Sequence, residues 1–412
     1  MIIKNAQIGN DTEKVDIVIQ DGKFKSIKPA GTVEDPADSN VLNLDGKMIL
    51  PPFIESHVHL DATRTAGEPH WNMSGTLFEG IATWAERKES LTKKDVMDRA
   101  RETIRHQAKN GVGFVRTHVD VTDPKLTALD ALLELKEELK DIVTLQIVAF
   151  PQEGILSFPH GKELMEKAME LGADVVGAIP HFEFTREYGV ESLNYAVELA
   201  EKYDALLDAH CDEIDDEQSR FVETLATRAY ESGHGERMTA SHTTAMGSYN
   251  GAYASRLFNV LTKSHLNIVS NPLVNIHLQG RFDDYPKRRG LTRVKELVAA
   301  GVNVAFGHDD IFDPWYPLGD GNMRDVVHMG LHVAQMMGYP EIQESYRFIT
   351  DNAAQVLQLT DYGIAEGNSA SFIVLDAPDW YTALNEKREV LYHFEQGRLI
   401  AETKPHETTL HF

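Results

Sequence analysis

The hydrophobic and polar positions of the chain form a β-rich beginning, a long alternating middle and a β-rich end. The first 51 residues hold short runs of β-branched residues, and Asp21-Gly22 between two of these runs is typical of a tight turn. A similar pattern returns after residue 360, with Gln396-Gly397 as a second expected hairpin turn. We therefore expect residues 1–51 and 360–412 to pack together as one small β domain.

Residues 52–359 form a second unit, in which short apolar runs alternate with longer charged stretches of helical period. This alternation is typical of βα units and a parallel sheet. The apolar runs are Met48–Leu60, Phe114–Val121, Val143–Pro151, Asp174–Phe182, Ala205–Glu213, Met238–His242, Leu266–Pro272 and Asn303–Asp310. Eight strands with interleaved helices predict a TIM-type (β/α)8 barrel of the α/β class. No Gly-x-Gly-x-x-Gly follows the first run, which argues against a dinucleotide-binding open sheet.

Charge and cysteine content narrow the range of partners and compartments. The chain has 64 acidic and 40 basic side chains and a formal charge of −24. Because such a surface repels phosphate backbones and anionic lipid, we expect no nucleic-acid or membrane partner and a free small-molecule substrate. The single cysteine, Cys211, excludes an internal disulfide and a Cys-x-x-Cys metal site. Without a signal-peptide pattern or a membrane-spanning run, a cytoplasmic location is expected.

Imidazole and carboxylate side chains lie at the carboxyl ends of four predicted strands, where a barrel of this type carries its active site. They are His57 and His59 on the first strand, His210 and Glu213 on the fifth, His242 on the sixth and Asp309 on the eighth. Alternation along a strand places the two histidines of the first strand on one face. A metal centre explains why four distant strand ends carry such side chains.

The simplest centre is one divalent ion bound by His57, His59, His210 and Asp309. Three imidazoles and a carboxylate suit Fe²⁺ or Zn²⁺ better than Mg²⁺ or Ca²⁺. The fourth predicted strand ends without a lysine that could be carbamylated to bridge two metals, so one ion is expected. Glu213 can then carry protons, and His242 can orient the metal-activated water or stabilise an oxyanion.

At this point the chain resembles the amidohydrolase superfamily and, within it, the bacterial cytosine deaminases. The resemblance runs from about residue 50 to residue 367. It is carried chiefly by His57-Val58-His59-Leu60-Asp61, Phe150-Pro151-Gln152-Glu153-Gly154, His210-Cys211-Asp212-Glu213, Phe306-Gly307-His308-Asp309-Asp310 and Asp313-Pro314-Trp315. His-x-His alone identifies only the superfamily, whereas the second and fourth of these segments are far more selective.

The resemblance implies a barrel with an attached β-sandwich, one iron or zinc ion, and hydrolytic deamination of free cytosine to uracil and ammonia by a metal-bound hydroxide. It assigns His57, His59, His210 and Asp309 as metal ligands. It also implies a proton shuttle at Glu213, an orienting histidine at His242, a base-reading Gln152, and pocket positions at Asp310 and Trp315. Asp309 would also accept the proton of the hydroxide. The family commonly forms hexamers, so a homo-oligomer is expected.

Two alternatives stay open. A related cyclic amidine deaminase would favour isoguanine or creatinine, and a non-catalytic metal-binding barrel is the alternative from another class. His118, Asp120, His181 and Glu183 either line the pocket or support it from behind. The long segment Ala62–Glu79, with Trp71 and Phe78, is a candidate wall or lid.

Overall fold

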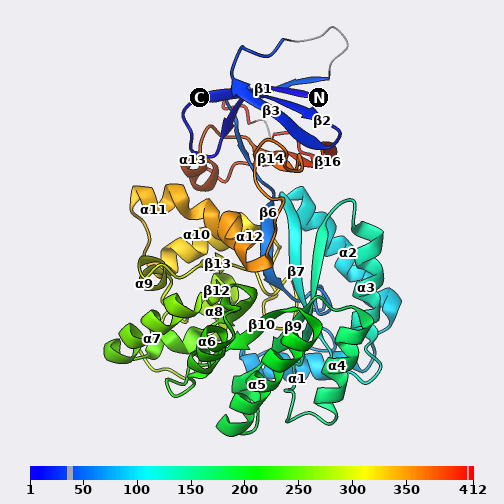
Figure 1. The fold of residues 1–412 in the computed structure, drawn as a ribbon, viewed down its shortest axis with the longest axis vertical. Coiled ribbons are helices and arrows are strands. Elements are labelled where there is room, and N and C mark those ends of the chain that lie inside the picture. The colour runs from blue at the N-terminus through cyan, green and yellow to red at the C-terminus, as the bar shows by residue number, and fades with distance from the viewer. Residues whose placement is uncertain (35–39, 406–407) are drawn as a thin grey trace.

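The computed structural model describes residues 1–34, 40–405 and 408–412, which form a barrel and a smaller β domain above it (Figure 1). The barrel strands are β6 (Phe53–Val58), β7 (Val112–Asp120), β8 (Thr144–Phe150), β9 (Val175–Ala178), β10 (Leu206–Cys211), β11 (Met238–His242), β12 (Asn267–Ser270) and β13 (Val304–Phe306). Each strand pairs in parallel with its neighbour in this order. The predicted (β/α)8 barrel is confirmed.

Helices surround the barrel and separate its strands (Figure 1). Those that follow the first six strands are α1 (Leu77–Lys88), α2 (Lys93–Lys109), α3 (Thr127–Leu139), α4 (Gly161–Leu171), α5 (Arg186–Tyr203), α6 (Phe221–Ser232) and α7 (Gly251–Ser264). Later in the chain come α8 (Pro272–Leu278), α9 (Val294–Ala299), α10 (Met323–Ala334), α11 (Tyr339–Glu344), α12 (Asp351–Leu357) and α13 (Trp380–Asn385). Among the described residues, no helix has the length and apolar character needed to cross a membrane.

The small domain is built from both ends of the chain, as predicted. Its strands are β1 (Ile2–Ile8), β2 (Lys14–Gln20), β3 (Lys23–Pro29), β4 (Val41–Asn43), β5 (Met48–Leu50), β14 (Phe372–Leu375), β15 (Val390–Glu395) and β16 (Arg398–Glu402). The antiparallel pairing of β5 with β14 joins the amino-terminal and carboxy-terminal strands. Both expected hairpin turns have two consecutive residues with positive φ, 53° and 74° at residues 21–22 and 50° and 74° at residues 396–397.

The predicted first barrel strand, Met48–Leu60, is wrong at its beginning. Met48–Leu50 is β5 of the small domain, and only Phe53–Val58 belongs to the barrel. Pro51 and Pro52 separate the two strands, and they lack the N–H groups that a continuous strand would donate. The apolar run is therefore shared between the two domains.

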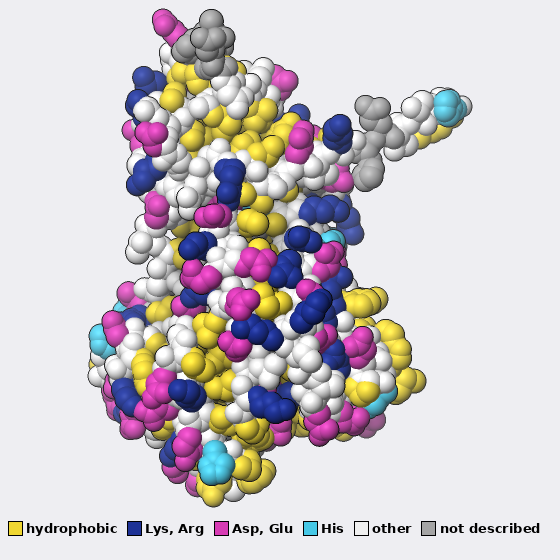
Figure 2. All heavy atoms as spheres, turned by 90° about the vertical axis from the view of Figure 1, so that its right-hand side faces the viewer, with side chains coloured by type: hydrophobic (Ala, Val, Ile, Leu, Met, Phe, Trp, Pro, Cys, Tyr) yellow, Lys and Arg dark blue, Asp and Glu magenta, His cyan; other side chains and the backbone are white. Residues whose placement is uncertain are grey.

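Charged side chains are mixed over the face of the molecule that carries α2 and α3. Figure 2 shows basic and acidic groups interspersed there rather than separated into patches of one sign. Arg101 pairs with Glu138 at 2.8 Å, and Lys136 pairs with Asp174 at 2.6 Å. On this face the negative net charge is therefore partly balanced by local ion pairs.

Arg116, a buried arginine, hydrogen-bonds to several elements inside the barrel. Arg116 on β7 donates from Nη1 to Asp208 Oδ2 on β10 at 3.0 Å, and both side chains are fully buried. Its remaining nitrogens donate to Gln146 Oε1 at 3.0 and 2.9 Å and to the carbonyl of Val356 at 2.8 Å. Val356 lies in the last turn of α12, where carbonyl groups carry partial negative charge. The guanidinium thus has hydrogen-bond partners on three elements.

Replacing this arginine should destabilise the protein strongly. Arg116→Ala leaves the Asp208 carboxylate buried without its cation, which costs about 3–5 kcal/mol of unfolding free energy. The exposed Arg105→Ala on α2 is the matched control and should change it by less than about 0.5 kcal/mol. Urea unfolding followed by circular dichroism measures both, and equal stability of the two variants would contradict the interpretation.

Candidate active site

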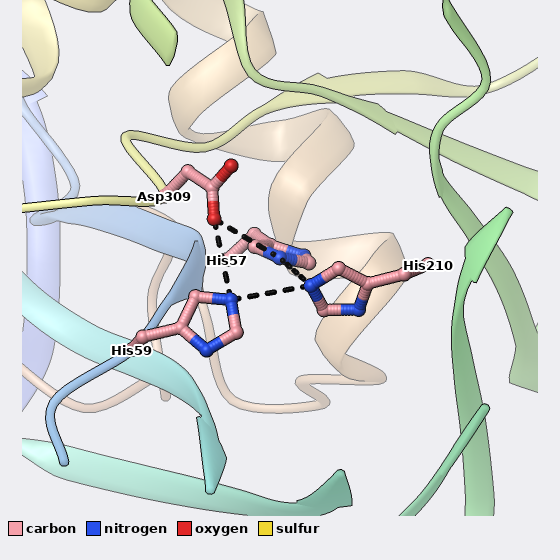
Figure 3. Close-up of side chains that lie close together, drawn as sticks. All are labelled: His57, His59, His210 and Asp309. Carbon is pink, nitrogen blue, oxygen red and sulfur yellow. Dashed lines mark hydrogen bonds and ion pairs between the residues drawn. The ribbon is translucent and has the colours of Figure 1, made fainter. Parts of the chain in front are cut away.

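Four side chains at or just beyond the carboxyl ends of three barrel strands converge on one point (Figure 3). His210 Nε2 lies 3.1 Å from His57 Nε2 and 3.2 Å from His59 Nε2. Asp309 Oδ1 lies 3.4 and 3.3 Å from the same two nitrogens. Donors bound to one tetrahedral ion at about 2.0–2.1 Å stand roughly 3.4 Å apart, so these spacings fit a single ion.

The imidazoles of this cluster are suited to bind a metal rather than to carry charge. Burial lowers the pKa of His57, His59 and His210, and the neighbouring imidazoles lower those of His57 and His210 further. Each ring is therefore neutral near pH 7, with a lone pair free for a cation. The four residues thus form a buried cluster suitable for one metal ion, and its donor types suit Fe²⁺ or Zn²⁺.

A chain of hydrogen bonds behind His57 fixes which of its nitrogens can bind the metal. His57 Nδ1 lies 3.0 Å from Ser241 Oγ, and that hydroxyl donates to Asp208 Oδ1 at 2.6 Å. Because the serine proton is given to the carboxylate, its oxygen must accept from the Nδ1–H of His57. Nε2 then carries the lone pair and faces the cluster. This chain ends on Arg116, which pairs with the same carboxylate.

Glu213 and His242 lie next to Asp309 of the cluster. Glu213 Oε1 is 3.3 Å from His242 Nδ1, and Asp309 Oδ2 is 3.7 Å from the same nitrogen. Burial raises the pKa of Glu213, and the Asp309 carboxylate raises it further. Asn275 Nδ2 contacts His242 Nδ1 at 3.0 Å and so helps to hold the ring. An acid and an imidazole therefore face the same space as the metal cluster.

Local backbone geometry turns Glu213 into the pocket. Simple strand alternation would point it away from the side of His210, but Asp212 between them has a φ of 55°. The Asp212 carboxylate accepts from the backbone N–H groups of Phe221 at 2.9 Å and Val222 at 2.8 Å, at the beginning of α6. The helix start thus anchors the turn that presents the glutamate.

The pocket beside the cluster is lined by both polar and apolar residues. Its lining includes the predicted residues Gln152, Asp310 and Trp315. It also includes Leu77, Ile179 and Leu278, which the sequence did not reveal. Of the candidate wall Ala62–Glu79, only Leu77 lines the pocket, whereas Trp71 and Phe78 are about half exposed, at 53% and 48%. Leu77 therefore contributes to the pocket wall, whereas Trp71 and Phe78 do not line the pocket, and a lid role of the segment stays a prediction.

His118, Asp120, His181 and Glu183, which the sequence left as either pocket lining or support, contact the site and its loops without lining the pocket. The His118 ring stacks on His57 with a centroid distance of 3.8 Å, and Asp120 accepts from Lys88 and Trp84. Burial lowers the pKa of His181 to about 4, and Glu183 binds the loop after β8. None of the four is among the residues that line the pocket.

The comparisons with known proteins agree with this arrangement. The sequence model of the Amidohydrolase family matches residues 40–391. The chain belongs to the amidohydrolase family. A crystal structure of 5-methylcytosine deaminase from Klebsiella pneumoniae liganded with 5-fluorocytosine is 51% identical to this amidohydrolase, with a TM-score of 0.97 over 100% of this chain and 99% of that one. The same enzyme was also solved with phosphonocytosine, again at 51% identity and a TM-score of 0.97.

A more distant relative is N-isopropylammelide isopropyl amidohydrolase from Pseudomonas sp. (strain ADP). It is 28% identical over 411 residues, which cover 97% of this chain and 96% of the relative. Both relatives therefore extend over the small domain as well as the barrel of this amidohydrolase. The predicted membership of the amidohydrolases is confirmed.

Residues that sequence reasoning missed include Ser241, Asp208 and Arg116. Each carried a readable signal, because Asp208 precedes His210 by two positions and so shares its face of the strand. Ser241 directly precedes His242, and Arg116 is a charge within an apolar run. The pocket residues Leu77, Ile179 and Leu278 carried no such signal, because apolar residues occur throughout the chain.

Ser241→Ala should weaken metal binding without unfolding the protein. The His57 ring then loses the acceptor that fixes its tautomer, and losses of this kind reduce metal affinity about 10–100-fold. Ser255→Ala, on the exposed face of α7, is the matched control. Competition with a chromogenic chelator measures the affinity, and equal affinities in the two variants would disprove the role of Ser241.

Proposed function

We propose that this amidohydrolase deaminates free cytosine-type bases, converting cytosine and water to uracil and ammonia. The observation that carries the proposal is the full-length similarity, at 51% identity, to an enzyme named 5-methylcytosine deaminase and solved with a cytosine analogue. The buried cluster of three imidazoles and a carboxylate beside Glu213 supports hydrolysis in particular.

His57, His59, His210 and Asp309 would hold the metal ion. When bound, the ion lowers the pKa of a coordinated water and supplies a nucleophile at neutral pH. Asp309 uses Oδ1 toward the imidazoles, which leaves Oδ2 as a base for the proton of that water. Fe²⁺ and Zn²⁺ both suit this set, and the choice between them remains part of the proposal.

Glu213 and His242 handle proton transfer and developing charge at the reacting carbon. Glu213 protonates the ring nitrogen beside C4 as the C–O bond forms. The proton accepted by Asp309 then passes to the amino group, and the C–N bond breaks to leave the C4 carbonyl and release ammonia. His242 stabilises the oxygen atom at C4 by a hydrogen bond and is oriented by Asn275. The Gln152 amide, which has a donor and an acceptor, pairs with the N–H and C=O edge of the base.

The apolar residues of the pocket lining favour a second substrate, 5-methylcytosine. Leu77, Ile179, Leu278 and Trp315 line the same cavity as Gln152 and offer contacts for a methyl group. The name of the 51% identical structure supports this substrate. Isoguanine and creatinine are the competing bases that the sequence left open.

Three further expectations remain proposals. The assembly into a homo-oligomer, with a hexamer suggested by the family resemblance, follows from that resemblance alone. A cytoplasmic location follows from the single buried Cys211. The domain limits at residues 51–52 and 359–360 follow from the sequence pattern.

Removing the metal should abolish ammonia release, because the nucleophile depends on the ion. Chelator-treated protein is expected to be inactive on cytosine and to regain activity with Fe²⁺ or Zn²⁺, as a coupled ammonia assay would show. The same assay on 5-methylcytosine, isoguanine, creatinine and cytidine ranks the substrates. The proposal fails if neither cytosine nor 5-methylcytosine is turned over by the metal-loaded enzyme.

Glu213→Gln should keep the metal and lose nearly all turnover. The amide cannot carry a proton, and loss of a general acid–base group costs about 10²–10⁴-fold in kcat. Glu217→Gln, exposed in the same loop, is the control for the change in charge. Metal analysis and steady-state kinetics test the pair, and full activity of Glu213→Gln would remove this residue from the mechanism.

A further inference from the structure

The base-reading side chain of this site lies on a loop rather than on a strand. Gln152 follows β8 by two residues and lines the pocket. Within the described part of the chain, the backbone N–H of Gln152 donates to the carbonyl of Phe150 at 3.2 Å, whereas its side-chain amide forms no hydrogen bond. Its orientation toward a ligand therefore depends on where the backbone of residues 151–157 is held.

Glu183 binds this loop from one side. Its Oε1 accepts from the backbone N–H groups of Ile155 at 2.7 Å and Leu156 at 3.1 Å. Its Oε2 accepts from the N–H of Ser157 at 2.8 Å and from the Ser157 hydroxyl at 2.6 Å. Three consecutive N–H groups around one carboxylate form an anion-binding nest. Glu183 lies beyond the end of β9, so this contact joins two neighbouring strand ends.

The loop sequence is adapted to this carboxylate. Gly154 has a φ of 93°, and a Cβ at this position would lie 2.9 Å from Glu183 Oε2. A side chain there would therefore be strained and would also crowd the carboxylate. The Ser157 hydroxyl accepts in turn from the backbone N–H of Phe184 at 2.8 Å, which adds a second link between the same segments. Glu183 itself is only 8% exposed.

Lys88 holds the loop from the other side. Its ammonium group contacts Glu153 Oε1 at 2.7 Å, next to Gln152 in the chain. The same group donates to Asp120 Oδ2 at 2.9 Å and Thr122 Oγ1 at 3.0 Å, at the end of β7. Lys88 is the last residue of α1, and this pairing therefore joins the loop to the helix whose first residue, Leu77, lines the pocket.

The amino-terminal end of α1 contacts the part of the pocket that includes Trp315. Leu77, its first residue, lines the cavity. Gly80 lies so close to Trp315 that a Cβ would stand 2.4 Å from the indole Cδ1. One helix thus contacts both the aromatic wall and, through Lys88, the Gln152 loop.

We propose that Glu183 and Lys88 are positioning residues for Gln152. Their hydrogen bonds and ion pair to residues 151–157 set the affinity of the site for its base. The proposal rests on the proposed function, in which the Gln152 amide pairs with the substrate. Glu183 acts as the main anchor, because it makes four hydrogen bonds to the loop. Lys88 restrains the part of the loop next to Gln152 through its ion pair with Glu153.

The test compares Glu183→Gln with Glu187→Gln. Glu187 is an exposed glutamate on α5, so its substitution removes the same charge away from the loop. A glutamine amide presents one NH₂ group toward the nest, which repels part of the backbone donors. We expect the KM for cytosine to rise at least about tenfold in Glu183→Gln with kcat changed less than about threefold, since binding is lost equally in ground and transition states. Metal content and the kinetics of Glu187→Gln should match the unaltered enzyme.

A double-mutant cycle separates positioning from a merely structural role. In the Gln152→Ala background, Glu183→Gln should raise KM no further, because the side chain through which it acts is gone. An equal rise in both backgrounds, or a loss of kcat at unchanged KM, would overturn the proposal. Glu153→Gln, at a partly exposed position, is the second variant if Glu183→Gln does not fold, and its smaller KM increase should also vanish without Gln152.

Hydrogen exchange distinguishes this proposal from the proposed function. The amides of residues 155–157 should exchange faster in Glu183→Gln than in Glu187→Gln, whatever the substrate. If Glu183→Gln exchanges faster but the unaltered enzyme turns over neither cytosine nor 5-methylcytosine, the proposed function is refuted while the anchoring of the loop by Glu183 stands. If exchange and KM are both unchanged in Glu183→Gln of an enzyme that does turn over one of these bases, the positioning role of Glu183 is refuted while the proposed function stands.

Discussion

The structure depends on the seam where the first barrel strand meets the segment after the last one. Asp309 donates its N–H to the carbonyl of His57 at 2.7 Å, and its own carbonyl accepts from the N–H of His59 at 3.2 Å. The buried carboxylate of Glu55 accepts from the N–H groups of His57 and His308 at 3.2 and 2.8 Å. The contacts that close the barrel therefore also position His57, His59 and Asp309, three of the four candidate metal ligands.

Behind this seam the barrel interior is unusually polar for a buried sheet. Arg116, Asp208 and Ser241 replace the branched apolar layers that commonly fill such barrels, and they end on the ring of His57. Burying an ion pair is costly in solvation, so the gain lies in a fixed ring orientation rather than in stability. The candidate metal ligand His57 is thus supported by a network that reaches across the barrel to α12.

The pocket beside the candidate metal cluster is lined by loop residues that neighbouring elements hold in place. Gln152 stands on a loop bound by Glu183 and Lys88, and Trp315 is held by Asp313, whose carboxylate accepts from its N–H at 3.0 Å. The helix α1 contacts both sides. The strand ends thus carry the candidate metal ligands, while supported loops carry Gln152 and Trp315 of the pocket lining.

By itself, the sequence determined the strand count, the joining of both ends into one domain and the identity of the converging imidazoles and carboxylates. These follow from local rules, because strand alternation places His57 with His59 and parallel strands share one carboxyl edge. Only the tertiary structure decided that Met48–Leu50 leaves the barrel, that Leu77 rather than Trp71 faces the pocket, and that Glu183 grips residues 155–157. Such contacts join residues far apart in the chain, and their partners depend on three-dimensional packing rather than on any period along the sequence.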